Sequence, residues 1–301
     1  MIIKTRSQSI ELQSYELLNK RMNLAEQDKQ YFNNLKKGHD GERMFDTLIE
    51  KLQCDCLVIN DLLLTTNNTT YQIDSLLIMP DAIYLFEVKN FEGDFYYQSN
   101  RFYKRPKAEM VDPLIQLKRT ESLFDMLLQK LGFNIPINAW IVFINSEFTL
   151  YQAPLDSPII FPTQINRFLK NLDRNTSKIT QKHRALAEKL VSLHIQESPY
   201  KQLPTYEYAQ LQKGISCKMC GGISVLIEGK TCICTQCGQQ EPVESAVLRS
   251  VKEFKQLFPN ERITTNVIFD WCRVVKSKRR INRILSKHYK IIGTHQWAYY
   301  E

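Results

Sequence analysis

The 301-residue sequence has no apolar run of the ~18–20 residues that a membrane-spanning helix needs, because Pro80-Asp81 interrupts the longest candidate. The stretch from Met1 to Arg6 also lacks the continuous apolar core of a signal peptide. General disorder is excluded by composition, since 43% of the residues are hydrophobic and 11% are aromatic. We therefore expect a globular, cytoplasmic protein with no membrane partner and with more than one domain.

Cysteine is sparse outside one short stretch. Five of the eight cysteines lie between positions 217 and 237, while Cys54, Cys56 and Cys272 stand apart and are expected to be structural. Clustering of this kind suits metal binding in a reducing compartment better than a disulfide framework.

The clustered cysteines form two C-x2-C-G motifs separated by a strand-like segment with a glycine turn. Cys217 and Cys220 make the first pair, and Cys234 and Cys237 make the second. Two intervening residues let both thiolates of a pair reach one tetrahedral ion, and the glycine after each pair permits the turn that aims backbone amides at sulfur. The spacing predicts a zinc ribbon with a closed, structural Zn²⁺ site, from which Cys232 is offset.

The net positive charge is concentrated after residue 244, because the 28 Lys and Arg before it are nearly balanced by 27 Asp and Glu. The formal net charge is +8, and residues 244–301 hold 12 Lys and Arg against 5 Asp and Glu. The apolar spacing of this region predicts three short helices, with Thr265 as the cap of the second and Ser277 as the cap of the third. A basic patch confined to one module is typical of a protein that binds a polyanion.

The last of these helices carries cations in its first turn, where the helix dipole disfavours them. DNA phosphates would explain the placement, because recognition helices present their N-terminal residues to the major groove. The short connection to the preceding helix favours a helix-turn-helix, although its turn lacks glycine. The alternative is a solvated basic face on a small helical bundle. The candidate DNA-binding residues are Lys278, Arg279, Arg280, Arg283 and Lys287.

Two apolar strand patterns, at 73–79 and 83–88, flank a tight turn at residues 80–81. A two-residue turn sets Asp74 directly opposite Glu87 on one face of the hairpin. Facing carboxylates repel each other, so the arrangement predicts a cation between them. Lys89 follows Glu87 by two residues and rises from the same face, where its ammonium can neutralise charge on a phosphate or orient an attacking water.

A further acid precedes these strands. A helix is expected to begin at Gly38, with His39 as a loop residue at its start, and its apolar residues recur at helical spacing through Leu52. Glu42 flanks that apolar stripe, from where it can reach the same metal ion or hold a metal-bound water.

These residues resemble the nuclease-related domain (NERD), a branch of the PD-(D/E)XK nuclease superfamily. The resemblance covers roughly residues 38–150 and rests on residues 38–42, Ile73-Asp74, residues 87–90 with Gly93, and Pro113-x-x-Gln116. Ile73, not proline, precedes the first aspartate, which agrees with the NERD pattern and departs from the wider superfamily.

The resemblance implies an α/β core that cleaves DNA with Mg²⁺ or Mn²⁺. It implies Asp74 and Glu87 as metal ligands, Lys89 as the catalytic lysine, Glu42 as the helical acid and Gln116 as the helical glutamine. Simpler interpretations stand beside these roles, because Glu-x-Lys on a strand is usually a solvated ion pair and Gln116 is equally an ordinary amide on a helix surface.

The predicted fold class is α/β: a PD-(D/E)XK nuclease-like core with a mixed sheet flanked by helices, a zinc ribbon, and a small C-terminal helical domain. The predicted parts are an N-terminal extension at 1–37, with a long polar helical pattern at 8–36, a nuclease-like domain at 38–196, a linker at 197–213, the zinc ribbon at 214–241 and the basic helical domain at 242–301.

Three functions fit this organisation. The leading hypothesis is a metal-dependent nuclease that hydrolyses DNA phosphodiester bonds in DNA processing or repair. The second is a non-catalytic DNA-binding or regulatory protein that keeps the nuclease fold as a scaffold. The third is an adaptor whose zinc ribbon binds a protein partner such as a polymerase or a helicase. The sequence predicts neither the structure of the DNA substrate nor the oligomeric state.

Overall fold

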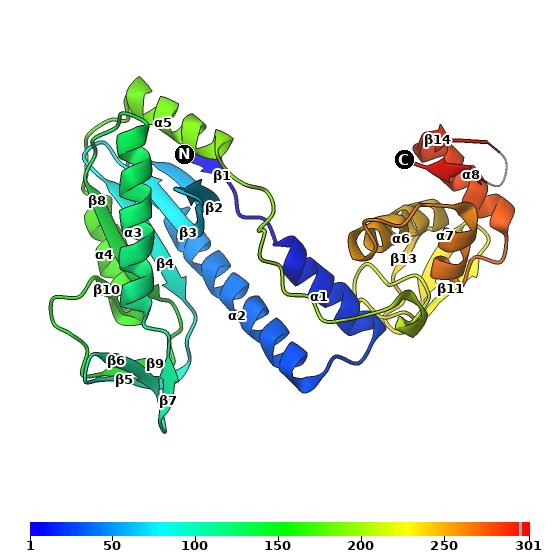
Figure 1. The fold of residues 1–301 in the computed structure, drawn as a ribbon, viewed down its shortest axis with the longest axis horizontal. Coiled ribbons are helices and arrows are strands. Elements are labelled where there is room, and N and C mark those ends of the chain that lie inside the picture. Colours follow the sequence, from blue (N-terminus) through cyan, green and yellow to red (C-terminus); the bar gives the residue numbers. More distant parts are fainter. Residues whose placement is uncertain (295–296) are drawn as a thin grey trace. The chain divides into compact units, whose positions relative to one another are not determined.

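The structure, a computed structural model, describes residues 1–294 and 297–301 (Figure 1). The chain forms two compact units. Unit 1 comprises Met1–Gln8 and Asn33–Tyr200, and unit 2 comprises Ser9–Phe32 and Lys201–Glu301. Each unit is therefore built from two separate segments of the chain. The five-part organisation expected from the sequence stays a prediction about independently folding domains.

The polar pattern over residues 8–36 forms two helices, so the expectation of one long helix is wrong. Helix α1 spans Ile10–Arg21 and helix α2 spans Glu26–Ile49. The expected helix start at Gly38 is also wrong, because Gly38 and His39 lie inside α2. No proline interrupts α2, and each of its two interior glycines costs the helix only about 1 kcal/mol, which tertiary packing offsets.

A six-stranded mixed sheet lies at the centre of unit 1, with the order β1-β2-β3-β4-β8-β10. Strands β2, β3 and β4 pair in antiparallel fashion, whereas the pairs β1–β2, β4–β8 and β8–β10 are parallel. The mixed α/β class is therefore confirmed. The strand bounds are β1 Ile2–Lys4, β2 Leu57–Thr66, β3 Thr69–Ile78, β4 Ile83–Lys89, β8 Ile137–Phe143 and β10 Ile159–Ile160.

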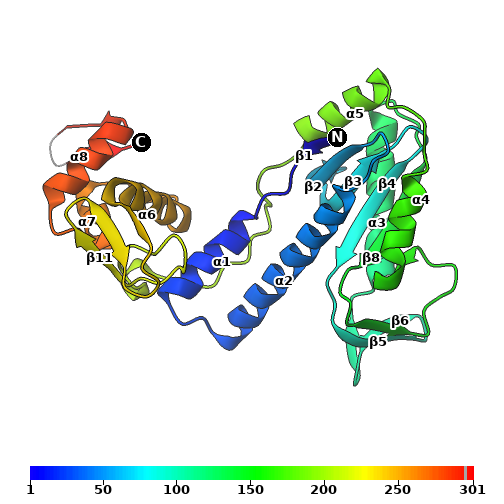
Figure 2. The ribbon, with the colours of Figure 1, turned by 180° about the vertical axis from the view of Figure 1, so that it is seen from behind.

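Helices cover both faces of this sheet. Helices α3 (Pro113–Lys130) and α5 (Gln181–Ser192) pack on one face, and α2 and α4 (Ile165–Leu172) pack on the other; a short 3-10 turn, η1 (Pro162–Gln164), precedes α4. The two views show α3 and α4 on opposite sides of the sheet (Figures 1 and 2). This double cover explains why the strands are continuous apolar runs: neighbours such as Leu85 and Phe86 are both fully buried, one on each face.

A second, four-stranded sheet in unit 1 has the order β7-β6-β5-β9. It contains the hairpin of β5 (Gly93–Gln98) and β6 (Arg101–Lys104), flanked by β7 (Ala108–Met110) and β9 (Phe148–Tyr151). One face of this sheet carries Phe95, Tyr97 and Phe102, which are buried in the core shared with α3. The alternating residues point away from that core.

Unit 2 combines the cysteine-rich segment with helices. It contains α1, the 3-10 turn η2 (Tyr208–Gln210), strands β11 (Val225–Glu228), β12 (Thr231–Cys234) and β13 (Gln240–Pro242), helices α6 (Val243–Leu257), α7 (Thr265–Cys272) and α8 (Lys278–His288), and the pair β14 (Ile291–Ile292) and β15 (Tyr299–Tyr300). The three predicted C-terminal helices are present. Ser277 caps α8 as expected, but Thr264 rather than Thr265 caps α7, accepting a hydrogen bond from Val267 N–H at 3.2 Å.

Arg21, at the end of α1, joins the parts of unit 2. Its side chain is 1% exposed and donates to the Glu253 carboxylate at 2.7 Å and to the Gln212 carbonyl at 2.9 Å. Its guanidinium also lies 4.0 Å from the centroid of the Trp271 ring. Arg21 therefore joins α1 to α6 through a buried ion pair and to α7 through a cation–π contact.

Among the helices formed by residues 1–294 and 297–301, none combines the length and the apolar composition that crossing a membrane requires.

Candidate active site and metal centre

The β3–β4 hairpin has the register that the sequence predicted. Met79 donates its N–H to the Ala82 carbonyl at 2.9 Å, and the ladder continues to the pair of Ser75 and Phe86. The next residues in this register are Asp74 and Glu87, where the ladder has ended. The two acids therefore lie just beyond the last β3–β4 pair, where these two strands separate while β4 stays paired with β8.

The Asp74 carboxylate takes over one backbone hydrogen bond. Its Oδ2 accepts from Val88 N–H at 2.8 Å, which ties the middle of β3 to β4. Asp74 is 7% exposed. Burial raises the pKa of Asp74 well above its ordinary value, and the nearby charges of Glu87 and Glu42 raise it further, while Lys89 and the Val88 N–H act in the opposite direction. A positive charge placed beside Asp74 would relieve this cost.

Glu87, Lys89 and Gln116 form a triangle of direct contacts. Glu87 Oε1 accepts from Lys89 Nζ at 2.7 Å and from Gln116 Nε2 at 2.7 Å. Lys89 Nζ also donates to Gln116 Oε1 at 3.0 Å. Lys89 thus rises from the same face as Glu87, as the strand alternation predicted, and Gln116 of α3 joins them. The Glu87 carboxylate is 5% exposed, so this ion pair is largely shielded from water.

Glu42 reaches the site from α2 and is held there by an arginine. Arg6 Nη1 donates to Glu42 Oε2 at 2.7 Å, and Arg6 Nε and Nη2 bind both oxygens of Asp46 at 2.8 and 3.0 Å. The same guanidinium donates to the Asp74 backbone carbonyl at 2.7 Å and lies 3.4 Å from Ser75 Oγ. The Arg6 side chain is 3% exposed. It therefore clamps the acidic face of α2 to the middle of β3.

The pKa of Glu42 is raised because burial disfavours its charge, an effect that Arg6 opposes and that neighbouring carboxylates, Glu87 among them, reinforce. If all are ionised, the four carboxylates of this cluster face two cations, Arg6 and Lys89, which leaves an excess of two negative charges. Carboxylate oxygens are the ligands that Mg²⁺ and Mn²⁺ prefer, and the excess charge equals that of one such ion with opposite sign. The oxygen donors therefore suit a divalent cation in chemical type, whereas among the described residues no three of these carboxylates bring their ligand atoms within 4.8 Å of one another.

The predicted catalytic residues share one pocket of about 470 Å³ within unit 1. Its wall also includes Lys104, together with Lys37 and the Glu92 carboxylate that Lys37 binds. A phosphodiester entering such a pocket would meet Lys104 at the wall and carboxylates at the centre. The predicted set found on this wall is Glu42, Asp74, Glu87, Lys89 and Gln116.

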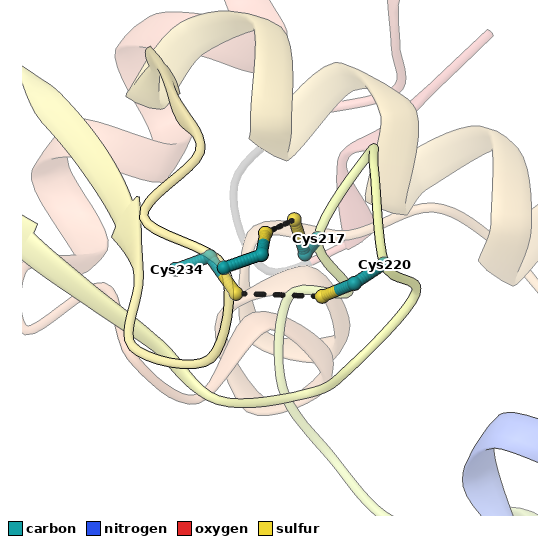
Figure 3. Close-up of side chains that lie close together, drawn as sticks. Cys217, Cys220 and Cys234 are labelled. Atoms are coloured by element: carbon teal, nitrogen blue, oxygen red, sulfur yellow. Dashed lines mark hydrogen bonds between the residues drawn. The ribbon is translucent and has the colours of Figure 1, made fainter.

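Four cysteines of unit 2 form the second cluster. Over the described parts of the chain, 1–294 and 297–301, Cys217, Cys220, Cys234 and Cys237 are the one group of three or more potential metal ligands whose ligand atoms all lie within 4.8 Å of one another. The Sγ atoms of Cys217 and Cys237 are 3.6 Å apart, as are those of Cys220 and Cys234 (Figure 3). Four convergent sulfurs fit a tetrahedral zinc ion.

The local turns explain the convergence of the cysteines. Gly221 and Gly238 follow the two pairs with φ of +73° and +72°, which glycine adopts without strain. Burial disfavours the Cys217 thiolate, but hydrogen bonds from the backbone N–H groups of Cys220 and Met219 outweigh this effect and lower the pKa of Cys217. Cys232 lies outside the group, and burial raises the pKa of its thiol to about 11.

The basic residues of α8 are divided between internal contacts and exposure. Lys278 donates to Asn266 Oδ1 at 2.9 Å, Arg280 to the Gly229 carbonyl at 2.8 Å, and Lys287 to Glu244 at 2.7 Å. Arg279 and Arg283 are exposed on the same helix. A DNA-binding role for the five residues stays a prediction, and three of them also hold α8 against its neighbours.

Sequence reasoning missed Arg6, Asp46 and Ser75. Asp46 follows Glu42 by four residues on α2, a spacing that places both on one helix face, so a signal was present. No sequence signal marked Arg6. The parallel pairing of strand β1 with β2 brings residues near the N-terminus to the site, and the sequence does not predict this pairing.

The family model of the nuclease-related domain matches residues 37–144. The match includes Glu42, Asp74, Glu87, Lys89 and Gln116, and it excludes Arg6 and the four-cysteine group. No curated protein and no solved structure matches the chain. Residues 37–144, with their α/β fold, therefore form a nuclease-related domain.

Proposed function

We propose that this protein is a metal-dependent nuclease that hydrolyses DNA phosphodiester bonds in DNA processing or repair. The observation that carries the proposal is the convergence of Glu42, Asp74, Glu87 and Lys89 on one pocket within the nuclease-related domain. A buried acidic cluster with an excess of negative charge is costly in a purely structural role. A divalent cation and a bound phosphate would offset that cost.

Asp74 and Glu87 would hold Mg²⁺ or Mn²⁺, and these ions typically bind one or two carboxylates together with waters and substrate phosphates. The bound ion would supply Lewis-acid activation of the phosphodiester and of water. Lys89 would stabilise negative charge on the phosphate, and Gln116, 3.0 Å from Lys89 Nζ, would orient the ammonium. Glu42, held by Arg6, would accept a hydrogen bond from the attacking water.

The test is cleavage of plasmid and branched DNA with Mg²⁺ or Mn²⁺. We expect Asp74→Asn and Lys89→Ala each to lower the cleavage rate by about 100-fold or more. Matched controls are Asp40→Asn, an exposed acid on α2, and Lys118→Ala, an exposed cation on α3; both should cleave like the wild type. Equal cleavage by all five proteins would remove the proposal.

The second candidate is a non-catalytic DNA-binding protein that keeps the nuclease fold as a scaffold. The observation in its favour is the exposure of Arg279 and Arg283 on α8, together with the excess of basic residues in 244–301. It requires salt-sensitive DNA binding that weakens in Arg279→Gln/Arg283→Gln, with no metal-dependent cleavage. Arg273→Gln, at another exposed arginine of unit 2, is the matched control.

A further inference from the structure

Three tyrosines form a row across the four-stranded sheet of unit 1. Tyr96 of β5 lies opposite Tyr103 of β6 in the antiparallel pairing, and Tyr96 lies beside Tyr151 of β9 in the parallel pairing. Residues that are partners in register point to the same face of a sheet. The row therefore runs over three adjacent strands, on the face opposite to the buried Phe95 and Phe102.

This tyrosine face is open to solvent. Tyr151 is 47% exposed, and Tyr96 and Tyr103 are partly exposed. The rings of Tyr96 and Tyr103 are stacked, with centroids 5.2 Å apart and planes at 16°, so each ring keeps one face that does not contact the other. Tyrosine is common in strands for its conformational preference alone. Alignment of three such rings in one solvent-facing row needs a further explanation.

The tyrosine face carries charges of both signs. Arg101 and Arg105 are its cations, and Asp94 and Glu109 are its acids, whereas Lys104 pairs with Phe95 on the opposite face. The Arg105 guanidinium lies 5.9 Å from the Tyr151 ring centroid, and Arg101 contacts Glu109 at 3.3 Å in an exposed pair that contributes little. Asp94 accepts a hydrogen bond from Tyr151 Oη at 3.4 Å. Aromatic rings beside cations suit a ligand that is both flat and anionic.

We propose that the tyrosine face binds unpaired nucleotides of a DNA strand. Bases would stack on Tyr96, Tyr103 and Tyr151, while Arg101 and Arg105 contact the phosphates. Base pairs hide the faces of bases inside a duplex, so this surface favours single-stranded, flapped or frayed DNA. The assignment to DNA rests on the proposed nuclease function, whereas the preference for unpaired bases rests on the tyrosine row.

The tyrosine face belongs to the same sheet as part of the pocket wall. Phe95 and Lys104, from the opposite face of β5 and β6, line the pocket that contains Asp74 and Lys89. A strand held on the tyrosine face would therefore be anchored on the sheet that borders the cleavage site. This would select substrates with an unpaired segment near the scissile bond.

The experiment measures DNA binding without cleavage. The full chain carries Asp74→Asn, divalent ions are omitted, and the probes are a short single strand containing 2-aminopurine and a duplex of the same sequence. Stacking on an aromatic residue is worth about 5- to 150-fold in affinity per base. We expect Tyr96→Ala/Tyr103→Ala to weaken single-strand binding by about 10-fold or more, to change duplex binding by less than about 2-fold, and to abolish the quenching of 2-aminopurine.

Matched variants separate stacking from damage to the fold. Tyr96→Phe/Tyr103→Phe keeps the rings and should retain single-strand affinity, and Tyr200→Ala removes a tyrosine that is 72% exposed elsewhere and should bind like its parent. Tyr151→Ala, which leaves the stacked pair intact, repeats the test if the double variant unfolds. Arg105→Gln should reduce the salt dependence of single-strand binding.

Unchanged single-strand affinity in both alanine variants would overturn the inference, and it is the result expected if a protein covers this face. Equal losses for single strand and duplex, or tighter binding of a single-stranded RNA than of DNA, would also overturn it. Because binding is measured without catalysis, the outcome is independent of cleavage. Absence of cleavage in the wild type would remove the nuclease proposal and leave the tyrosine face standing.

Discussion

The two units each gather potential metal ligands, but they do so in opposite ways. In unit 2, four thiols from a 21-residue segment converge on one point and leave no position for a substrate. In unit 1, carboxylates from α2, β3 and β4 line an open pocket of about 470 Å³. The first arrangement suits an ion that holds a fold together, and the second suits an ion that a substrate can reach. The cysteines come from one short segment of the sequence, whereas the carboxylates come from three separate elements, and this accounts for the difference.

The largest expected effect is the loss of the zinc ion that we propose for the four-cysteine group of unit 2. Structural zinc contributes about 10–16 kcal/mol of binding energy to small modules, so Cys220→Ser should release the ion and unfold residues 214–242. Zinc content and hydrogen exchange measure this, and exchange in β2, β3 and β4 should not change. Cys232→Ser, at a cysteine outside the group, should retain one zinc per chain. Slow exchange of the ribbon amides in zinc-free Cys220→Ser would contradict a structural role.

Each unit contains a buried arginine from the first 21 residues that forms ion pairs. Arg6 binds Glu42 and Asp46 in unit 1, and Arg21 binds Glu253 in unit 2. Both side chains are 3% exposed or less. Removal of one partner from a buried ion pair leaves an uncompensated charge, which is far more costly than the net contribution of the intact pair.

Arg6→Met and Arg21→Met should therefore each destabilise their own unit by about 3–5 kcal/mol. Hydrogen exchange resolved by unit would show faster exchange in β3 for the first variant and in α6 for the second. Exposed arginines serve as controls: Arg101→Met in unit 1 and Arg273→Met in unit 2 should cost at most about 1 kcal/mol. Equal costs at buried and exposed positions would show that these clamps do not stabilise the units.

A smaller effect on stability is expected from alanine substitution of the two glycines inside α2, and its sign should differ between them. A Cβ on Gly41 would lie 2.5 Å from Asn90 Cβ, whereas a Cβ on Gly38 would meet nothing within 4 Å. Overpacking costs about 1–3 kcal/mol, against a gain of about 1 kcal/mol in helix propensity. Gly41→Ala should therefore destabilise unit 1, and Gly38→Ala should stabilise it. Thermal unfolding measures both, and a shift of the same sign in the two variants would contradict the close approach of α2 to Asn90, the residue after β4.

The smallest expected effect is a pH dependence in unit 1. Burial lowers the pKa of His194 below its ordinary 6.5, and Lys4 adds to this, while His194 Nδ1 accepts a hydrogen bond from Leu63 N–H at 3.1 Å. The folded state thus favours neutral imidazole, so its stabilising contribution is complete above about pH 6.5 and declines as the pH falls through the lowered pKa.

In His194→Gln, the stability of unit 1 should vary less between pH 7 and pH 5 than in the wild type. Urea unfolding at several pH values measures this. His288→Gln, in unit 2, should leave the pH dependence of unit 1 unchanged. A His194→Gln variant with the wild-type pH profile would show that the Leu63 contact does not depend on the neutral ring.

The hairpin register shows how far local sequence reasoning reaches. A two-residue turn fixes which residues of β3 and β4 are partners, so the approach of Asp74 to Glu87 followed from the sequence. Helix α2 shows where it fails, because two interior glycines were interpreted as a helix start and tertiary packing overrode their propensity. Gln116 is an intermediate case of prediction. Its motif is visible in the sequence, but its contact with Lys89 depends on how α3 packs.

The sequence by itself determined the features that depend on short separations along the chain: the paired cysteines, the strand that carries Glu87 and Lys89, and the apolar runs of a sheet covered on both faces. Tertiary structure alone decided the contacts between distant segments. The parallel pairing of β1 with β2 brings Arg6 to Glu42, and sheet pairing aligns three tyrosines in one row. The physical reason is that turns and periodicity are fixed by bonded neighbours, whereas long-range pairing depends on which buried surfaces fit together.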